Sequence, residues 1–279
     1  MENRGQPEHT APIGVFDSGV GGLTIARELV RRLPYEHVLY VADQLHVPYG
    51  GRPLEEIRSF ATALSDHLFI NGAKRVVMAC NISSATALDR VRERFGADRV
   101  LGVIEHGARA AIEATKTGRI GILATQGTVA TTAYSKHIHA LAVEARVFEI
   151  TCPRFVPFVE RNELDSAATE AAAREYLAPL LAERTDTIVL GCTHYPFLLP
   201  LLQRVAGERV SFVDPARATV DALEKNLGQG GSAALERSSL PHRLETTGDV
   251  EIFRNQLKIF WPELRDDARV EPLTADVFV

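Results

Sequence analysis

The stretch "KRVVMACNISSATALDRVRERF", residues 74–95, places one cysteine, Cys80, between an apolar run and a polar, helix-forming run. A short apolar run followed by a helical pattern is typical of a strand-to-helix unit. A second stretch, "TDTIVLGCTHYPFLLPLLQRV" at residues 185–205, repeats this arrangement around Cys192. The recurrence predicts two similar units, each with a thiol at the end of a buried strand.

The same alternation extends along most of the chain. We expect strands at Ile13–Phe16, Val38–Val41, Arg75–Ala79, Val100–Val103, Ile120–Ala124, Ala145–Ile150, Thr187–Leu190 and Val210–Val213. We expect helices at Leu23–Arg32, Leu54–Ile70, Ala85–Phe95, Val129–Ala142, Ala167–Glu183 and Phe197–Val205. One more strand and helix are expected in "HRLETTGDVEIFRNQLKIF", which follows a loop rich in glycine and serine. Repeated strand, helix and strand predict an α/β fold with mostly parallel sheets covered on both faces.

Ligands of such sheets collect beyond the carboxyl ends of the strands. Small and polar residues gather at these positions, in the segments Asp17–Gly22, Ala42–Gly51, Cys80–Ala85, Ala124–Thr128 and Cys192–Pro196. The first of them, "DSGVGG", lacks the lysine and the glycine spacing of a nucleotide-binding loop. It is better interpreted as a tight turn that presents backbone N–H groups to a carboxylate.

Composition narrows the class of protein. The 279 residues are 46% hydrophobic and 24% charged, with a formal net charge of -5, and they contain no basic run, so direct nucleic-acid binding is not expected. No apolar stretch approaches the roughly 20 residues of a membrane span, and the start "MENRGQPEHTAP" lacks a signal-peptide core. Three cysteines do not form a disulfide framework, so we expect a cytoplasmic, reducing setting. Cys152 precedes Pro153 and no helix start, which predicts a structural role.

The two repeated cysteines have the features of reactive thiols. A thiol at the start of a helix feels the positive end of the helix dipole and loses its proton more easily. The residues after the two cysteines are types that favour a helix start: Asn81, Ser83, Ser84, Thr193 and Pro196. This pattern predicts that both cysteines are acid/base groups, against the simpler alternative of two buried structural thiols.

Other chemistries fit the pair less well. A metal site is not expected, because the chain has no CxxC pattern and only Cys192 and His194 are closely spaced. A cysteine hydrolase built on those two residues leaves Cys80 without a role. Two acid/base groups on opposite faces of a substrate carbon use both thiols, since one removes a proton and the other returns one. Asp17, Glu160 and His194 stand in turns or loops where they can tune these groups.

Several segments together resemble the signature segments of the glutamate racemases. In chain order they are "GVFDSGVGGLT", "PYGGR", "ACN", "FVPFVE" and "LGCTHYP", followed by "TTGDVEIF". The resemblance runs from about Ile13 to Phe260. It implies two related α/β domains with the active site in the cleft between them. We expect the first domain over 13–98 plus 214–279 and the second over 99–213, after a disordered tail over residues 1–12 that the polar start of the sequence predicts. It also implies a homodimer.

The resemblance implies the reaction and the residues that perform it. The reaction is a cofactor-independent interconversion of L- and D-glutamate that supplies D-glutamate for peptidoglycan. Cys192 deprotonates L-glutamate and Cys80 deprotonates D-glutamate. Asp17 assists Cys80, and His194 with Glu160 assists Cys192. The implied substrate-binding residues are Asp17, Ser18, Pro48, Tyr49, Gly50, Asn81, Ile82, Thr125, Thr128, Thr193 and His194.

A few positions depart from the family's usual pattern. Ile82 stands where a threonine is usual, and Gln44, His46 and His106 replace threonine, arginine and proline. Ile82 and Gln44 therefore keep one alternative open, a racemase of another acidic amino acid such as aspartate. The resemblance to the family leaves a second one, a weakly catalytic regulatory protein that binds a protein partner such as gyrase.

Overall fold

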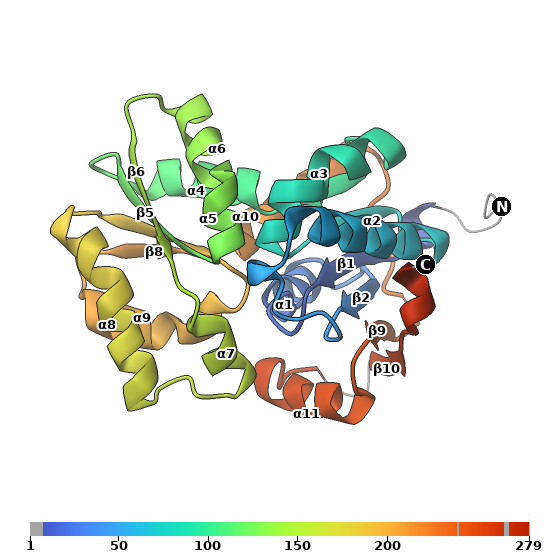
Figure 1. Ribbon diagram of the computed structural model, residues 1–279. Coiled ribbons are helices and arrows are strands. Elements are labelled where there is room, and N and C mark those ends of the chain that lie inside the picture. Colours follow the sequence, from blue (N-terminus) through green and yellow to red (C-terminus); the bar gives the residue numbers. More distant parts are fainter. Residues whose placement is uncertain (1–7, 239, 265–267, 279) are drawn as a thin grey trace.

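The computed structural model describes residues 8–238, 240–264 and 268–278, and these form two α/β domains around two separate sheets (Figure 1). The first sheet has six strands in the order β10-β9-β2-β1-β3-β4. Their bounds are β1 Ile13–Asp17, β2 Val38–Ala42, β3 Arg75–Met78, β4 Val100–Gly102, β9 His242–Thr246 and β10 Ala268–Pro272. The second sheet has four strands in the order β6-β5-β7-β8: β5 Arg119–Ala124, β6 Arg146–Thr151, β7 Thr187–Gly191 and β8 Ser211–Val213.

The two sheets share one topology, which confirms the two similar units expected from the sequence. In the first sheet the order β2-β1-β3-β4 corresponds to β6-β5-β7-β8 in the second, and every strand pair in the described part of the chain is parallel. Cys80 and Cys192 follow β3 and β7, which occupy the same place in the two sheets. The repeated motif of the sequence is thus a repeated position in the fold.

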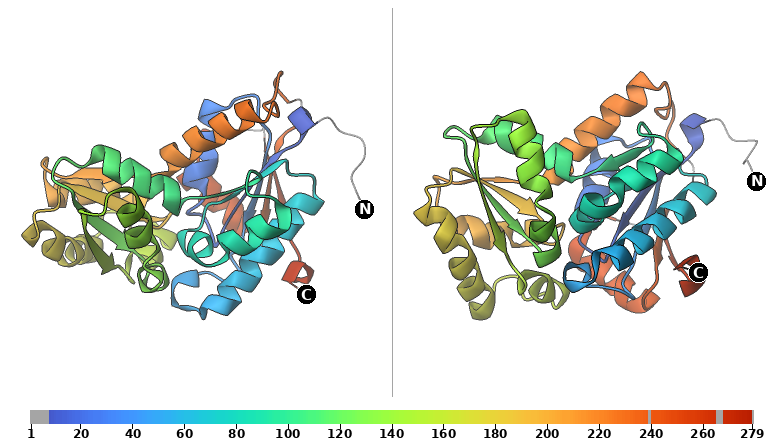
Figure 2. Two further views of the ribbon diagram at one scale, coloured as in Figure 1. Left: turned by 90° about the horizontal axis from the view of Figure 1, so that it is seen from above. Right: turned by 45° about the horizontal axis from the view of Figure 1, so that its top comes forward.

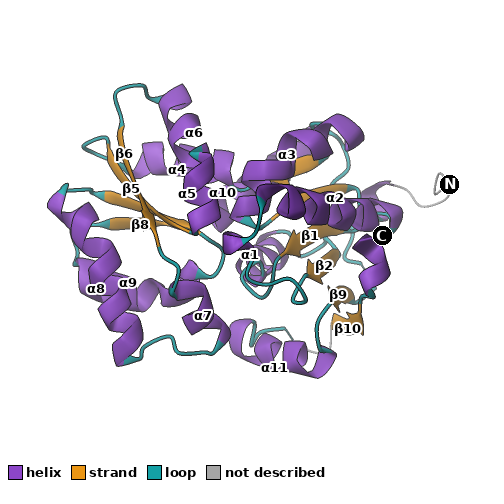
Figure 3. Ribbon diagram, in the orientation of Figure 1, coloured by secondary structure: helices purple, strands orange, loops and turns teal. Residues whose placement is uncertain are grey.

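Helices cover both faces of each sheet (Figure 3). Their bounds are α1 Leu23–Arg32, α2 Leu54–Ile70, α3 Asn81–Phe95, α4 Ile104–Ala114, α5 Gln126–Thr131, α6 Ala133–Leu141, α7 Phe155–Glu160, α8 Ala167–Ala182, α9 Leu199–Ala206, α10 Pro215–Gln229 and α11 Val250–Phe260. Adjacent residues of β1 show why the strand is apolar up to Asp17, because both of its faces are buried. Val15 packs in the core cluster that contains α1, and Phe16 packs in the cluster that contains α2 and α3. The helix α10 packs against both α1 and α4 and so links the two domains (Figure 2).

Three details correct the sequence-based expectations. The strand β4 pairs with β3, so residues 100–102 belong to the first sheet and not to the domain expected to begin at residue 99. The segment expected as one helix over Val129–Ala142 is two helices, because Thr132 adopts a left-handed conformation with φ 54°. The helix α3 begins at Asn81 and not at Ala85, which brings Cys80 directly to its N-terminus.

The ends of the chain add two observations. Of the tail expected over residues 1–12, residues 1–7 lie outside the described part, while Glu8–Thr10 form a short 3-10 helix. Within the described residues, no helix is long and apolar enough to cross a membrane.

Candidate active site

Both repeated cysteines line one small pocket between the two domains. Cys80 is 5% exposed and Cys192 is 7% exposed. The pocket residues of the first domain are Ser18, Pro48, Tyr49, Gly50, Cys80, Asn81 and Ile82, and those of the second are Thr125, Thr128, Val156, Gly191, Cys192, Thr193 and His194. The structure therefore brings together every residue expected to contact a substrate except Asp17, which lies directly behind Thr193. Val156 and Gly191 are pocket residues that sequence reasoning missed.

Cys80 is the N-cap residue of α3, but it does not ionise easily. Burial, and to a lesser extent the charge of Asp17, together raise the pKa of Cys80 from 9.0 to about 12. The loss of water around the thiolate thus outweighs the helix dipole. The thiol of Cys80 stays protonated at neutral pH in this closed arrangement.

Asp17 ends β1 and is completely buried. Its carboxylate accepts hydrogen bonds from Thr193 Oγ1 at 3.0 Å and from the backbone N–H of Gly19 at 3.1 Å. Burial raises the pKa of Asp17 above its ordinary value, although the charge of His194 and the bond from Thr193 act in the opposite direction. The turn of "DSGVGG" therefore offers the Gly19 N–H to its own carboxylate, and Thr193 connects Asp17 to the other domain.

Cys192 belongs to a hydrogen-bonded series with a histidine and a carboxylate. His194 Nδ1 lies 3.8 Å from Cys192 Sγ, and His194 Nε2 lies 2.7 Å from Glu160 Oε1. Burial alone lowers the pKa of His194, but its bonds to Cys192 and Glu160 and their charges raise it well above the usual value. The positive charge of His194 therefore lies beside the sulfur of Cys192.

The two cysteines therefore have opposite electrostatic surroundings. Cys192 faces a cation, His194, whereas Cys80 is close to an anion, Asp17. Such surroundings favour a thiolate at one sulfur and a thiol at the other. This is the protonation state that a two-base proton transfer needs before it starts.

Hydrogen bonds hold the polar side chains of the pocket in place. Tyr134 on α6, fully buried, donates its hydroxyl to Asn81 Oδ1 at 2.7 Å, across the two domains. Burial raises the pKa of Tyr134 well above its usual value, so the hydroxyl keeps its proton. The bond leaves the amide N–H groups of Asn81 as donors. Thr125 caps α5 by accepting from the Thr128 N–H, and their hydroxyls lie 3.0 Å apart. No sequence motif indicated Tyr134.

Two glycines allow the domains to approach closely at the pocket. A Cβ atom at Gly21 would lie 2.3 Å from Thr193 Oγ1 and 2.5 Å from His194 Nδ1. A Cβ atom at Gly50 would lie 2.7 Å from Thr125 Cβ. The pocket holds only about 20 Å³, room for roughly one water molecule. An amino-acid substrate can enter only if the domains separate.

Of the departures from the family pattern, Ile82 lines the pocket and the others lie outside it. Ile82 is buried in the pocket wall and reaches 3.1 Å from where a Cβ of Gly127 would stand, so it packs between the domains. Gln44 bonds to other side chains outside the pocket, and His46 bonds to Asp43 and stacks on the ring of Phe60. The side chains of Gln44 and His46 thus contribute packing and hydrogen bonds and do not line the pocket. His106 pairs with its neighbour Glu105.

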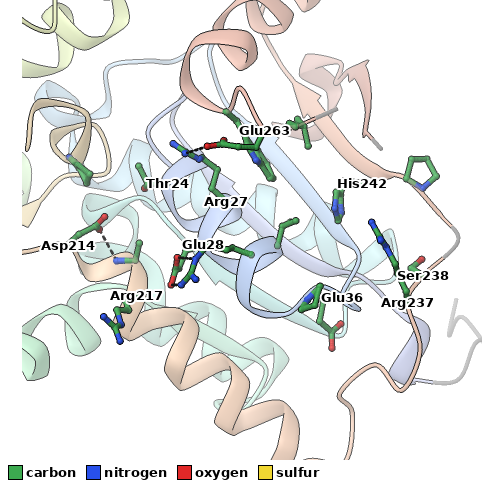
Figure 4. Close-up of a pocket in the computed structure, with 18 of the residues that line it drawn as sticks. Thr24, Arg27, Glu28, Glu36, Asp214, Arg217, Arg237, Ser238, His242 and Glu263 are labelled. Atoms are coloured by element: carbon green, nitrogen blue, oxygen red, sulfur yellow. Dashed lines mark hydrogen bonds and ion pairs between the residues drawn. The ribbon is translucent and has the colours of Figure 1, made fainter. Parts of the chain in front are cut away.

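A much larger hollow, about 1120 Å³, lies beside α1 and α10 (Figure 4). Both arginines and carboxylates line it. Arg27 pairs with Glu263 and Arg31 pairs with Glu28, so the charges balance within each pair. Among the described residues that line it there is no cysteine. Size alone therefore does not mark the reactive site, whereas the paired thiols do. Nor does the described part of the chain contain a group of three or more histidine, cysteine, aspartate or glutamate residues placed to hold a metal ion.

Comparisons with known proteins identify the relatives of this chain. Residues 13–223 match the family model described as Asp/Glu/Hydantoin racemase. A glutamate racemase of Gloeothece citriformis is 46% identical over 245 residues, which cover 88% of this chain and 87% of that protein. The crystal structure of a glutamate racemase isoform from Bacillus anthracis superposes with a TM-score of 0.89 at 36% identity, covering 96% of this chain and 98% of the other. That of glutamate racemase from Francisella tularensis in complex with D-glutamate superposes with a TM-score of 0.87 at 29% identity and the same coverage.

Proposed function

The chain belongs to the Asp/Glu/hydantoin racemase family and is an amino-acid racemase acting on glutamate, and we propose that Cys80 and Cys192 perform the reaction without a cofactor. The observation that supports these roles is the pocket itself, which the two thiols enter from equivalent strand ends of two similar sheets. The relatives named above are glutamate racemases, which does not favour the aspartate or regulatory alternatives.

The proposed reaction moves one proton off and one proton on. The Cys192 thiolate removes the α-proton of L-glutamate, becomes a thiol, and leaves an electron pair shared by the α-carbon and its carboxylate. The Cys80 thiol then donates its proton to the opposite face of that carbon. The products are D-glutamate and a thiolate at Cys80. Starting from D-glutamate, the same steps run in reverse.

The charges near each sulfur support this order of events. His194, held by Glu160, stabilises the thiolate that attacks L-glutamate. Asp17 and burial keep Cys80 protonated until it must donate. We infer that the enzyme without substrate has the protonation state that reacts with L-glutamate, a thiolate at Cys192 and a thiol at Cys80. After each conversion of L-glutamate it has the reverse state, which reacts with D-glutamate.

The other pocket residues serve as donors to a substrate with two carboxylates. Hydroxyl, amide and backbone N–H groups come from both domains: Ser18, Tyr49, Gly50, Asn81, Thr125, Thr128 and Thr193. Charged groups that lose water on binding need such partners. Closure of the domains around glutamate then excludes water and strengthens these contacts, which stabilises the charge that develops at the α-carbon.

Isotope exchange tests the two-base assignment. The protein is incubated with L-glutamate in deuterated water, and product and recovered substrate are analysed early in the reaction. Two bases place deuterium in the D-glutamate while the recovered L-glutamate keeps its protium. Transfer of the original protium into D-glutamate would refute the assignment, because it requires a single base.

Cys80→Ala and Cys192→Ala should each abolish racemisation, with Cys152→Ala as the control. Parallel assays on L-aspartate check the substrate.

We also propose that the protein is a cytoplasmic homodimer and that it supplies D-glutamate for peptidoglycan. Within each chain, we propose domain boundaries after β4 and near residue 214. The three cysteines of the described chain are free thiols, which suits a reducing compartment. On α11 the side chains of Ile252 and Ile259, seven residues apart on one face, are 59% and 47% exposed. These two exposed isoleucines are the apolar contacts that we propose for self-association. Light scattering should give twice the mass of the chain, and a monomer would contradict the dimer.

A further inference from the structure

Glu160 uses both of its carboxylate oxygens, and one of them reaches out of the pocket to another helix. Its Oε1 accepts from His194 Nε2 at 2.7 Å, and its Oε2 accepts from Gln256 Nε2 at 3.0 Å. Glu160 ends α7 of the second domain, whereas Gln256 lies on α11 of the first. Figure 1 shows these two helices end to end along the lower edge of the molecule. The second bond therefore crosses from one domain to the other.

The amide of Gln256 is itself fixed in one orientation. Gln44 Nε2 donates to Gln256 Oε1, so the Gln256 NH2 group must face Glu160. Gln44 Oε1 in turn accepts from Thr246 Oγ1 at 2.9 Å, at the end of β9. Gln44 has little freedom, since a Cβ at Gly248 would stand 2.8 Å from Gln44 Cβ. The hydrogen bonds thus form one directed series from the first sheet to the carboxylate.

Glu160 needs such support more than its partner does. The side chain of His194 is 2% exposed, but that of Glu160 is 20% exposed. A partly solvated carboxylate with one bond can turn toward water, and a histidine then loses the group that fixes its ring. Glutamine suits the supporting position because it donates a hydrogen bond without adding a charge. A lysine there would compete with His194 for the negative charge of Glu160.

We propose that Gln256 is a positioning residue for the catalytic pair His194 and Glu160, and that it acts only when the two domains are closed. In the closed enzyme, Gln256 holds Glu160 so that His194 directs its Nδ1 at Cys192. When the domains open to admit substrate, the bond between Gln256 and Glu160 breaks, and Cys192 loses part of its activation. Gln44, which is bonded to Gln256, is a positioning residue of the same kind, one hydrogen bond further from the reacting groups. This inference rests on the proposed role of Cys192.

The test compares Gln256→Met, which keeps the length of the side chain but cannot donate, with the unaltered protein. Loss of one hydrogen bond to a charged group predicts a fall in kcat/KM of roughly tenfold or more. His194 faces three ionisable groups, Cys192, Glu160 and Asp17, and the variant loosens only Glu160. The alkaline limb of the kcat/KM profile should therefore move to lower pH, because a less firmly held carboxylate stabilises the imidazolium less.

A double-mutant cycle distinguishes positioning from general packing. If Gln256 acts through Glu160, adding Gln256→Met to Glu160→Gln has no further effect on kcat/KM. Additive losses, or an unchanged pH profile in Gln256→Met, would overturn the proposal while leaving the two-thiol mechanism intact. Asn255→Ala, the exposed neighbour on the same helix, is the matched control and should keep full activity. If Gln256→Met does not fold, Gln44→Met must show the same shift of the alkaline limb, and its absence overturns the proposal equally.

Discussion

Gly21 should be the most sensitive glycine of this racemase, since replacing it with alanine forces the two domains apart at the reacting centre. The added Cβ would lie 2.3 Å from Thr193 Oγ1 and 2.5 Å from His194 Nδ1, whereas ordinary contacts begin near 3.4 Å. Neither atom can simply move away, because Thr193 is bonded to Asp17 and His194 is bonded to Glu160. The domains must therefore separate by about 1 Å at this point.

A displacement of that size is large for catalysis and small for folding. Misplacing reacting groups by about 1 Å costs on the order of 100-fold in rate, so we expect a fall of that size in kcat/KM for Gly21→Ala. The folded domains can relieve the contact by opening slightly. The melting temperature should consequently change by no more than about 2 °C.

Gly51→Ala is the matched control for this prediction. A Cβ at Gly51 meets nothing within 4 Å, although the residue lies next to the pocket glycine Gly50. Coupled assays of both directions of racemisation, with thermal melts of each variant, measure the comparison. Near-normal kcat/KM in Gly21→Ala, or an equal loss in Gly51→Ala, would show that the domains do not meet as closely as described.

Three further predictions follow from single side chains. Burial raises the pKa of Cys80 from 9.0 to about 12, so the stability that its neutral form contributes is complete below pH 9 and declines as the pH rises toward 12. In denaturant unfolding above pH 9, the unaltered protein should lose about 1 kcal/mol more unfolding free energy per pH unit than Cys80→Ala. Equal slopes would contradict the burial of this thiol. Tyr134→Phe leaves Asn81 Oδ1 without its donor, so kcat/KM should fall roughly tenfold while the far-ultraviolet circular dichroism is unchanged; normal kinetics would mean that Asn81 needs no support. Cys152→Ala should racemise glutamate at the normal rate and lose roughly 1 kcal/mol of unfolding free energy, and a large loss of activity would reveal a third functional thiol.

Much of the fold was accessible from local patterns. Strands buried on both faces are continuously apolar, so β1, β2, β5 and β7 were recognised to within a residue or so of their ends. The break at Thr132 was not recognised, because a left-handed threonine has no local signal. Assigning residues 100–102 to the second domain was wrong, since only pairing with β3 shows which sheet a short strand joins.

The sequence by itself indicated the chemistry: two thiols after equivalent strands, with Asp17, His194 and Glu160 in turns or loops from which they could tune those thiols. These are local features, because a strand end and a helix start lie within a few residues of each other. The tertiary structure alone decided the surroundings of each sulfur. It buried Cys80 enough to reverse the effect of the helix dipole, and it brought Tyr134 and Gln256 from distant segments to support Asn81 and Glu160. Desolvation and contacts between domains depend on the whole packed chain, so no short stretch of sequence contains them.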